Sequence, residues 1–155
     1  MAIGAIEIQQ RMAAFAGLCR RHGIKETHQR TEIYRELARS NQHPDAESVY
    51  LAVRRRIPSI SLDTVYRTLR LLEEQGVIWR VGTLRERTRF DGNTQRHHHF
   101  VCRECGKVTD FHHEDLDKLS PPQEAAALGA IEYMHVELRG ICAACRAKRT
   151  GSRER

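Results

Sequence analysis

Two Cys-x-x-Cys pairs in the last third of the chain constrain its fold more than any other feature. They are Cys102 with Cys105, and Cys142 with Cys145. Each spacing lets two thiolates reach one ion from a tight turn, and four sulfurs complete a tetrahedral shell with no position open for substrate. We therefore expect a structural Zn2+ site, and a fold that brings the two pairs together.

The alternative for these cysteines is two disulfides in a secreted domain. Residues 1–11 contain no apolar leader, and disulfides would leave Cys19 unpaired, so zinc is the preferred interpretation. Cys19 shares the apolar side of a predicted helix with Met12 and Phe15, where a buried free thiol is the ordinary outcome. No apolar run is long enough to span a membrane. We expect a soluble protein in a reducing cytoplasm, with no membrane partner.

The net charge of +6 conceals an asymmetry between two parts of the chain. Residues 54–89 hold nine arginines against four acidic residues, whereas residues 97–145 hold four basic residues against eight acidic ones. This division indicates one domain that meets a polyanion and another that senses or assembles. A merely solvated basic surface is the alternative, and charge alone does not decide between them.

Periodicity in the basic half predicts a series of helices. Apolar spacing places them at residues 6–21, at 27–40, from Pro44 onward, and at 62–75. Gly23 separates the first two, Ser61 is a natural N-cap for the fourth, and Gly76 is placed to end it.

The last two helices, joined by a short turn at residues 57–60, suit a helix-turn-helix. The outer face of the 62–75 helix displays Tyr66, Arg67 and Arg70. Arginine can read guanine or grip phosphate, and tyrosine can contact a thymine methyl group or the DNA backbone. A solvent-facing tyrosine without a partner is the alternative.

A strand pair is predicted to follow the helices. Residues 77–81 are strand-like, a turn is expected at 82–83, and residues 87–90 would return as a β-wing with Arg87 and Arg89 along the phosphate backbone. The expected fold class is therefore α+β, with a winged helix-turn-helix domain over residues 1–90.

A second group of metal-binding residue types surrounds the first cysteine pair. The candidates are Asp91, His97, His98, His99, Asp110, His112 and His113. Strand alternation puts His97 and His99 on one face and turns His98 away. Asp110, on a further strand expected at 107–111, could complete a mixed nitrogen and oxygen site that suits Fe2+, Mn2+ or Zn2+.

Taken together, these features make the chain resemble the ferric uptake regulator superfamily over residues 23–145. The matching stretches are His28-Gln29-Arg30, His43-Pro44-Asp45-Ala46, Thr64-Val65-Tyr66-Arg67-Thr68-Leu69, Arg89-Phe90-Asp91, His97-His98-His99-Phe100-Val101-Cys102, Cys105-Gly106-Lys107-Val108, Asp110-Phe111 and Gly140-Ile141-Cys142. The resemblance implies an amino-terminal winged helix, a small α/β dimerisation domain over residues 91–145 with the four-cysteine zinc, and a regulatory Fe2+ or Mn2+. It also implies a homodimer on a double-stranded DNA operator, without an organic cofactor.

When the family's regulatory-metal ligands are matched by position to this sequence, the resemblance implies His43, Asp91, His97, His99 and Asp110. By spacing alone, His43 is a loop histidine before a proline, more often exposed than liganded. Metal binding would draw the two domains together and so convert metal affinity into DNA affinity.

The predicted DNA contacts combine the outer face of the 62–75 helix and the β-wing with Arg30 from a matching stretch, and a tail lies outside the match. The DNA-binding set is Tyr66, Arg67, Arg70, Arg30 and Arg87. Residues 146–155, rich in Lys, Arg, Gly and Ser, are expected to form a disordered basic tail.

Two features favour the peroxide-sensing branch of the superfamily. Aspartate occupies both 91 and 110, where iron-uptake members more often carry glutamate. The family's second sensory site is interrupted, because Met134 replaces its histidine, His135 is expected on the opposite strand face, and Arg96 stands where a further histidine is common.

The predicted function is thus a transcriptional repressor loaded with Fe2+ or Mn2+. In peroxide-sensing relatives, Fe2+ reacts with hydrogen peroxide and oxidises a ligand histidine, which releases DNA; the equivalents are His43 and His97. The alternative is an iron or other divalent-metal uptake regulator that uses the metal as corepressor.

Other classes fit the sequence less well. A deaminase would need His-x-Glu followed by Pro-Cys-x-x-Cys; His-x-Glu occurs at residues 112–114 and 135–137, but neither Cys-x-x-Cys pair is preceded by proline. A paired nucleophile and base is also missing, so we expect no enzyme. A zinc ribbon without sensing would leave His43, Asp91, His97 and Asp110 unassigned. Pro121-Pro122 interrupts the expected long dimerisation helix, which would restart there and run to Leu128.

Overall fold

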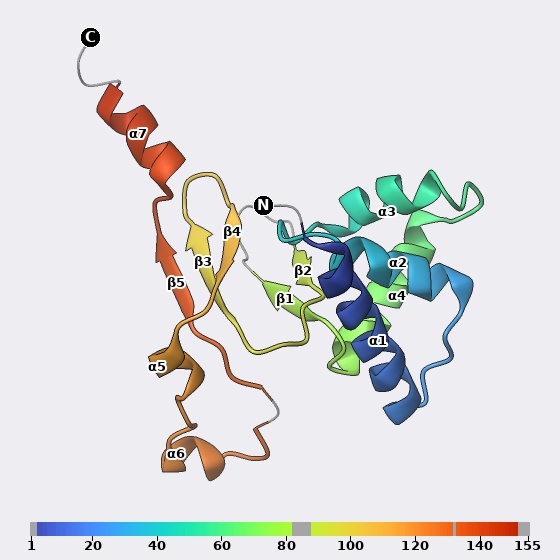
Figure 1. The fold of residues 1–155 in the computed structure, drawn as a ribbon, viewed down its shortest axis with the longest axis horizontal. Coiled ribbons are helices and arrows are strands. Elements are labelled where there is room, and N and C mark those ends of the chain that lie inside the picture. Colours follow the sequence, from blue (N-terminus) through green and yellow to red (C-terminus); the bar gives the residue numbers. More distant parts are fainter. Residues whose placement is uncertain (1–2, 82–87, 132, 152–155) are drawn as a thin grey trace. The chain divides into compact units, whose positions relative to one another are not determined.

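The chain divides into two compact units, Met1–Thr94 and Gln95–Arg155, in a computed structural model that describes residues 3–81, 88–131 and 133–151 (Figure 1). Asp91, expected to begin the second domain, belongs to the first unit. Within the described residues, no helix combines the length and the apolar character that a membrane crossing requires.

The amino-terminal unit has the element order of a winged helix-turn-helix. Its described elements are α1 (Ala5–Arg21), α2 (His28–Ala38), α3 (Ala46–Arg54), α4 (Leu62–Glu74), β1 (Trp79–Val81) and β2 (Arg89–Asp91). The two strands pair antiparallel, with Trp79 opposite Asp91. The predicted turn at 82–83 and Arg87 lie outside the described residues.

Side-chain caps decide where three of these helices begin. Thr27, Asp45 and Ser61 each accept a hydrogen bond from the backbone N–H three residues further on. The predicted start of α4 is thereby confirmed, and α2 begins one residue later than predicted, at His28. The predicted start of the third helix at Pro44 is wrong, because Asp45 is its cap and α3 begins at Ala46.

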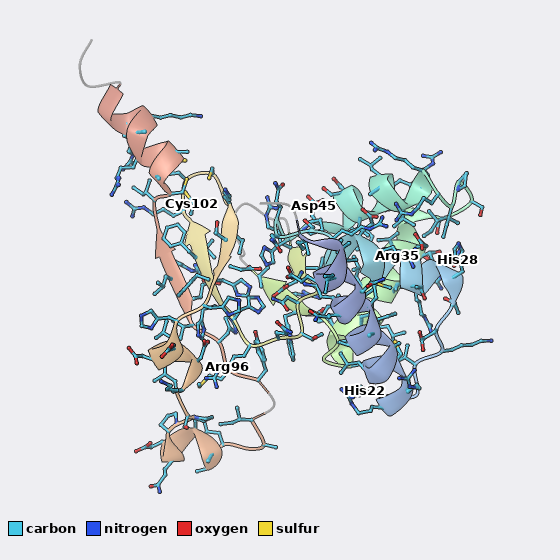
Figure 2. The ribbon with its side chains drawn as sticks, viewed as in Figure 1. His22, His28, Arg35, Asp45, Arg96 and Cys102 are labelled. Carbon is cyan, nitrogen blue, oxygen red and sulfur yellow. The ribbon has the colours of Figure 1, made fainter. Side chains whose placement is uncertain are left out.

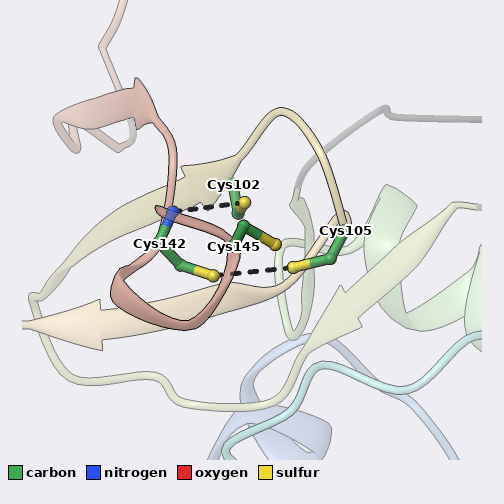
Figure 3. Close-up of side chains that lie close together, drawn as sticks. All are labelled: Cys102, Cys105, Cys142 and Cys145. Atoms are coloured by element: carbon green, nitrogen blue, oxygen red, sulfur yellow. Dashed lines mark hydrogen bonds between the residues drawn. The ribbon is translucent and has the colours of Figure 1, made fainter. Parts of the chain in front are cut away.

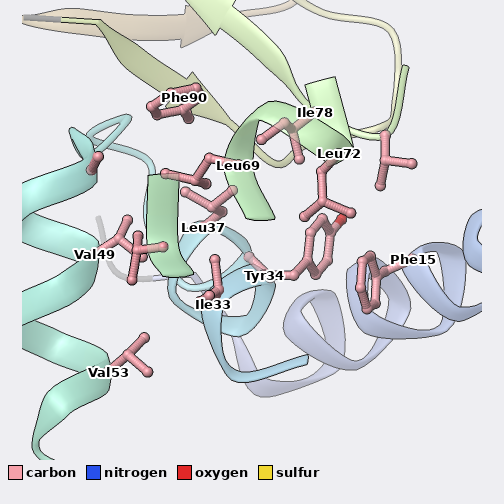
Figure 4. Close-up of a cluster of buried hydrophobic side chains, with 14 of the residues drawn as sticks. Phe15, Ile33, Tyr34, Leu37, Val49, Val53, Leu69, Leu72, Ile78 and Phe90 are labelled. Carbon is pink, nitrogen blue, oxygen red and sulfur yellow. The ribbon is translucent and has the colours of Figure 1, made fainter. Parts of the chain in front are cut away.

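The core of this unit is formed by one apolar face from each helix (Figure 4). Phe15 of α1 stacks on Tyr34 of α2 with ring centroids 4.1 Å apart. Val65 and Leu69 of α4 are fully buried in the same cluster, as the helical spacing predicted. Cys19 is also fully buried, and burial raises the pKa of its thiol, so the prediction of a buried free thiol is confirmed.

The carboxy-terminal unit is built on a three-stranded sheet of order β4-β3-β5. Its elements are β3 (His98–Cys102), β4 (Val108–Phe111), α5 (Glu114–Asp117), α6 (Gln123–Ala126), β5 (Glu137–Gly140) and α7 (Ala143–Gly151). The central strand β3 pairs antiparallel with β4 and parallel with β5. The expected strand at 107–111 is confirmed, one residue shorter at its start.

Two predictions for this unit need correction. The helix expected from Pro121-Pro122 to Leu128 is only the single turn α6, because the Leu128 N–H bonds to the Ala125 carbonyl in a tightened last turn ahead of Gly129. Residues 146–151, expected to be disordered, form most of α7. Good helix formers occur there, and the Arg146 N–H bonds to the Cys142 carbonyl, so the helix continues from the second cysteine pair.

The end of the amino-terminal unit is anchored to its core at Gly92. The buried Tyr34 hydroxyl donates to the Gly92 carbonyl at 2.7 Å, and burial raises the pKa of Tyr34, which keeps this donor protonated. A Cβ atom at position 92 would lie 2.7 Å from Leu37 Cβ and 3.3 Å from the Leu37 carbonyl carbon. Glycine is therefore required for the segment after Asp91 to approach α2.

Gly92→Ala should destabilise the amino-terminal unit by about 1–3 kcal/mol, because the added methyl group overpacks against Leu37. Urea unfolding followed by fluorescence of Trp79, the single tryptophan, measures this unit. As a control, a Cβ atom at position 17 in α1 would lie 3.6 Å from Arg21 Nη1, an ordinary contact, so Gly17→Ala should stabilise by up to about 1 kcal/mol. Equal stability of Gly92→Ala and the parent protein would contradict the packing argument.

Candidate metal centres and nucleic-acid interface

The four predicted zinc ligands converge in the carboxy-terminal unit (Figure 3). Cys102 ends β3, Cys105 follows in the turn to β4, Cys142 follows β5, and Cys145 lies in α7. Their sulfur atoms all lie within 4.8 Å of one another, and Cys105 Sγ is 3.8 Å from Cys142 Sγ. A tetrahedral ion with Zn–S bonds of about 2.3 Å separates its sulfurs by about 3.8 Å, so the cluster fits structural Zn2+.

Backbone donors prepare one of these sulfurs to act as a thiolate. Amide groups of Cys105 and Cys142 lower the pKa of Cys102 to about 6; the Cys142 N–H lies 3.3 Å from its sulfur. The neighbouring thiols, Cys142 foremost, raise the pKa of Cys145 to about 12. The cluster therefore holds protons that a bound Zn2+ would displace, because zinc binds thiolates.

Cys102→Ser should reduce the zinc content from about one ion per chain towards zero and unfold the carboxy-terminal unit, since the apparent binding energy of structural zinc is folding energy. Elemental analysis of the purified protein and a thermal melt measure both effects. Cys19→Ala removes a thiol from the other unit and should retain zinc. A folded Cys102→Ser protein with a full zinc content would contradict the structural assignment.

Three residues of the predicted regulatory site also converge within the carboxy-terminal unit. The β3–β4 register places His99 opposite Asp110. His97 Nε2 lies 2.9 Å from His99 Nε2, and Asp110 Oδ1 lies 3.9 Å and 3.6 Å from these two nitrogens. The two imidazoles therefore lie on the same side of the chain as Asp110, as predicted, although His97 stands one residue before β3 begins.

A carbonyl oxygen orients the ring of His97. Its Nδ1 lies 2.7 Å from the Gln95 carbonyl, which can only accept, so Nδ1 carries the proton. In the neutral ring, Nε2 then presents a lone pair towards His99 and Asp110. A hydrogen-bonded second nitrogen of this kind is typical of metal-binding histidines.

His98 points away from these donors, as predicted, and it ties α5 to β3. Its Nδ1 accepts from the Val136 N–H at 3.1 Å, so Nε2 carries the proton and faces Asp117 Oδ1 at 3.0 Å. Burial lowers the pKa of His98, and the Asp117 carboxylate opposes that shift. Arg96, labelled in Figure 2, donates to the Leu119 carbonyl at 2.7 Å, just beyond α5.

The prediction for His135 is wrong. Position 135 precedes β5 and has no strand pleat to turn it away, so its ring lies 5.5 Å from that of His99 in an edge-on contact. His112 approaches His97 with ring centroids 6.1 Å apart. The sequence placed His112 among the candidate metal-binding residues, two positions after Asp110, whereas it carried no signal for the contact of His135 with His99. His113 instead caps α5 by accepting from the Asp115 N–H.

The other two predicted ligands lie together in the amino-terminal unit. His43 Nε2 is 3.7 Å from Asp91 Oδ1. The expectation from spacing that His43 is exposed is wrong, because its side chain is 1% exposed. Asp91 Oδ1 accepts the Asn93 N–H at 2.8 Å, which orients the carboxylate. Each unit thus carries nitrogen and oxygen donors of the kind that Fe2+ and Mn2+ accept.

The outer face of α4 presents the predicted DNA-contacting residues. Tyr66 is 49% exposed, and Arg67 and Arg70 pair along the helix with Asp63 at 3.0 Å and Glu74 at 2.7 Å. Such exposed pairs hold a side chain only weakly, so both guanidinium groups are available to a stronger anion.

Of the other predicted DNA contacts, Arg30 shares a groove with Arg67, where the start of α2 meets α4. Arg89, expected along the phosphate backbone, turns inward and donates to the carbonyls of Gln42 and His43. Arg87 lies outside the described residues.

Together, the winged helix-turn-helix unit, the four-cysteine cluster and the histidine-aspartate donors define a zinc-site winged-helix protein. The sequence profile of the ferric uptake regulator family matches residues 21–139. The peroxide-responsive repressor PerR of Staphylococcus epidermidis is 33% identical over 127 residues, which cover 82% of this chain and 85% of that protein. The chain belongs to the ferric uptake regulator family.

Solved structures show the same fold. The Campylobacter jejuni peroxide stress regulator superposes with a TM-score of 0.67 at 28% identity, covering 84% of this chain and 98% of that one. The Vibrio cholerae ferric uptake regulator superposes with a TM-score of 0.58, also at 28% identity, covering 80% and 96%. The predicted fold class is confirmed.

Proposed function

We propose that this chain is a metal-dependent DNA-binding repressor that senses peroxide. The observation that carries the proposal is that each unit holds buried imidazole and carboxylate donors, in addition to the four-cysteine cluster. The similarity to a protein named as a peroxide-responsive repressor supports the same function. The four cysteines are assigned to structural Zn2+.

The regulatory ion is Fe2+ or Mn2+, with His43, Asp91, His97, His99 and Asp110 as ligands. Support comes from the two short ligand distances, 3.7 Å for His43 with Asp91 and 2.9 Å for His97 with His99. Because these ligands belong to both units, a bound ion favours conformations in which all five converge. Metal binding and DNA binding then stabilise the same conformation, and each raises the affinity for the other.

A bound Fe2+ would supply the one-electron redox chemistry that opens the peroxide O–O bond, while the net electrons for the reduction of peroxide would come from the oxidised ring. The chain's own contribution is an oxidisable imidazole at His43 or His97. Addition of one oxygen atom to the ring consumes one hydrogen peroxide and releases one water. The altered ring is a poorer ligand, so the closed conformation and its DNA affinity are lost. Because the protein oxidises its own ligand once, it is a sensor and no enzyme.

The partner is a double-stranded DNA operator bound by a homodimer in the cytoplasm, where the thiolates stay reduced. A two-fold dimer presents two recognition helices to half-sites about one helical turn, or a multiple of it, apart. An apolar groove on the β4-β3-β5 sheet supports self-association. Phe100, Phe111, Leu138 and Ile141 line it, and Leu138 is 48% exposed.

Arg67→Ala should weaken operator binding by about 1–3 kcal/mol if α4 reads bases, because one bidentate contact is lost. The change is measured by fluorescence anisotropy. Mn2+-loaded protein is titrated into a DNA duplex that the parent protein has selected from a random pool. Lys118→Ala removes an exposed charge from the acidic unit and should leave affinity unchanged. If Arg67→Ala and Tyr66→Ala both bind the operator with the affinity of the parent protein, the surface that reads DNA bases lies elsewhere.

A brief exposure to micromolar hydrogen peroxide should abolish DNA binding by the Fe2+ form of the protein. The Mn2+ form should keep its DNA binding, because only Fe2+ readily delivers electrons to peroxide. Intact mass followed by peptide mapping should then locate one added oxygen on His43 or His97. His97→Ala should retain zinc and lose metal-activated DNA binding. Metal-dependent binding that survives peroxide without oxygen addition would instead identify a metal-uptake regulator.

A further inference from the structure

A short piece of the amino-terminal unit holds both of its candidate metal ligands. The Phe90 N–H donates to the Pro44 carbonyl at 3.1 Å, and Asp45, labelled in Figure 2, forms an antiparallel bridge with Arg89. The loop that carries His43 is therefore paired to β2, the strand that ends with Asp91. This pairing explains how two ligands distant in sequence come to lie together.

The backbone of His43 adopts a conformation that needs support from its surroundings. Its φ is 49°, and among the described residues no other non-glycine residue has a positive φ. An L-residue with a side chain is disfavoured in this left-handed region, because Cβ crowds the following carbonyl. Such a conformation persists where neighbouring contacts determine it, and it is commonest at functional sites.

Arg89 supplies that contact. Its Nη1 donates to the Gln42 carbonyl at 3.2 Å and to the His43 carbonyl at 3.1 Å, the two carbonyls on either side of the His43 N–Cα–C backbone. A planar guanidinium suits this task, because its N–H groups are fixed in direction and it stays charged. Since Arg89 lies on β2 two residues before Asp91, one side chain links both ligands.

We propose that Arg89 is a positioning residue for the regulatory metal, acting through His43. The proposal rests on the proposed function only in taking His43 as a metal ligand. It gives Arg89 a role opposite to that of a phosphate contact in the wing. A positioning residue sets how much metal is needed; a phosphate contact sets how tightly the metal-saturated protein holds DNA.

The first test needs no DNA. Co2+ is titrated into zinc-loaded protein and followed by absorption bands, with the absence of thiolate charge-transfer bands showing that the zinc cluster is intact. Arg89→Ala should weaken Co2+ binding by about 10–100-fold, as expected when a residue that orients a metal ligand is removed. Arg80→Ala is the matched control. Arg80 lies on the paired strand β1 and forms an ion pair with Glu73, so its removal should leave Co2+ affinity unchanged.

A double-mutant cycle separates positioning from general damage. If Arg89 acts through His43, then Arg89→Ala should have no further effect on Co2+ affinity in a His43→Ala background. The same loss in both backgrounds would overturn the proposal. Zinc content and thermal unfolding show whether each variant is folded. If Arg89→Ala does not fold, Arg89→Lys is the second variant, because it keeps the charge without the planar guanidinium. It should also weaken Co2+ binding. A folded Arg89→Lys protein that binds Co2+ as tightly as the parent protein would overturn the proposal.

DNA binding then distinguishes the two roles of Arg89. In Mn2+ titrations, Arg89→Ala should raise the Mn2+ concentration at half-saturation, while the affinity at saturating Mn2+ stays within about twofold of the parent protein and its salt dependence is unchanged. A reduced salt dependence with an unchanged Mn2+ midpoint would show a phosphate contact and overturn the proposal. If the parent protein itself needs no metal to bind DNA, the proposed function fails, and the Co2+ cycle still decides the role of Arg89.

Discussion

The pleat of β3 is the constraint on which the carboxy-terminal unit depends. Because successive side chains of a strand point to opposite faces, His99 faces His97 and Asp110 while His98 faces α5. The same strand delivers Cys102 to the zinc cluster at its end. Hydrogen bonds to β4 and β5 on its two edges hold that register. A slip by one residue would exchange the faces and dismantle both sets of donors.

In the amino-terminal unit, the comparable constraint is the pairing of β2 with the loop before α3. It combines a strand that ends in Asp91 with a loop that buries His43, and it connects both to the helical core through the Tyr34 hydroxyl bond to Gly92. The core, helix α4 and these two candidate ligands therefore belong to one packed body. A metal bound by His43 and Asp91 would act directly on the body that carries α4.

Local signals predicted much of this organisation. Capping residues such as Ser61 and the spacing of apolar residues located α2 and α4, because both depend on neighbours within one turn. The Cys-x-x-Cys spacing is local in the same way and indicated that each pair can bind one ion, whereas the sheet brings together the two pairs, of which Cys105 and Cys142 are 37 residues apart. The sequence did not reveal that Arg89 turns inward or that His135 reaches His99, since those contacts join segments remote in the chain.

The sequence by itself thus determined that four helices form in the amino-terminal half, and which residue types can bind zinc, because these follow from short-range geometry and side-chain chemistry. Tertiary structure alone decided the burial of His43 and its left-handed backbone, since an isolated loop would not adopt a disfavoured φ. The shortening of the helix after Pro122 and the extension of α7 follow instead from local hydrogen bonds, which the residue pattern did not reveal. For His43, contacts with the distant strand β2 outweighed the local preference of the chain.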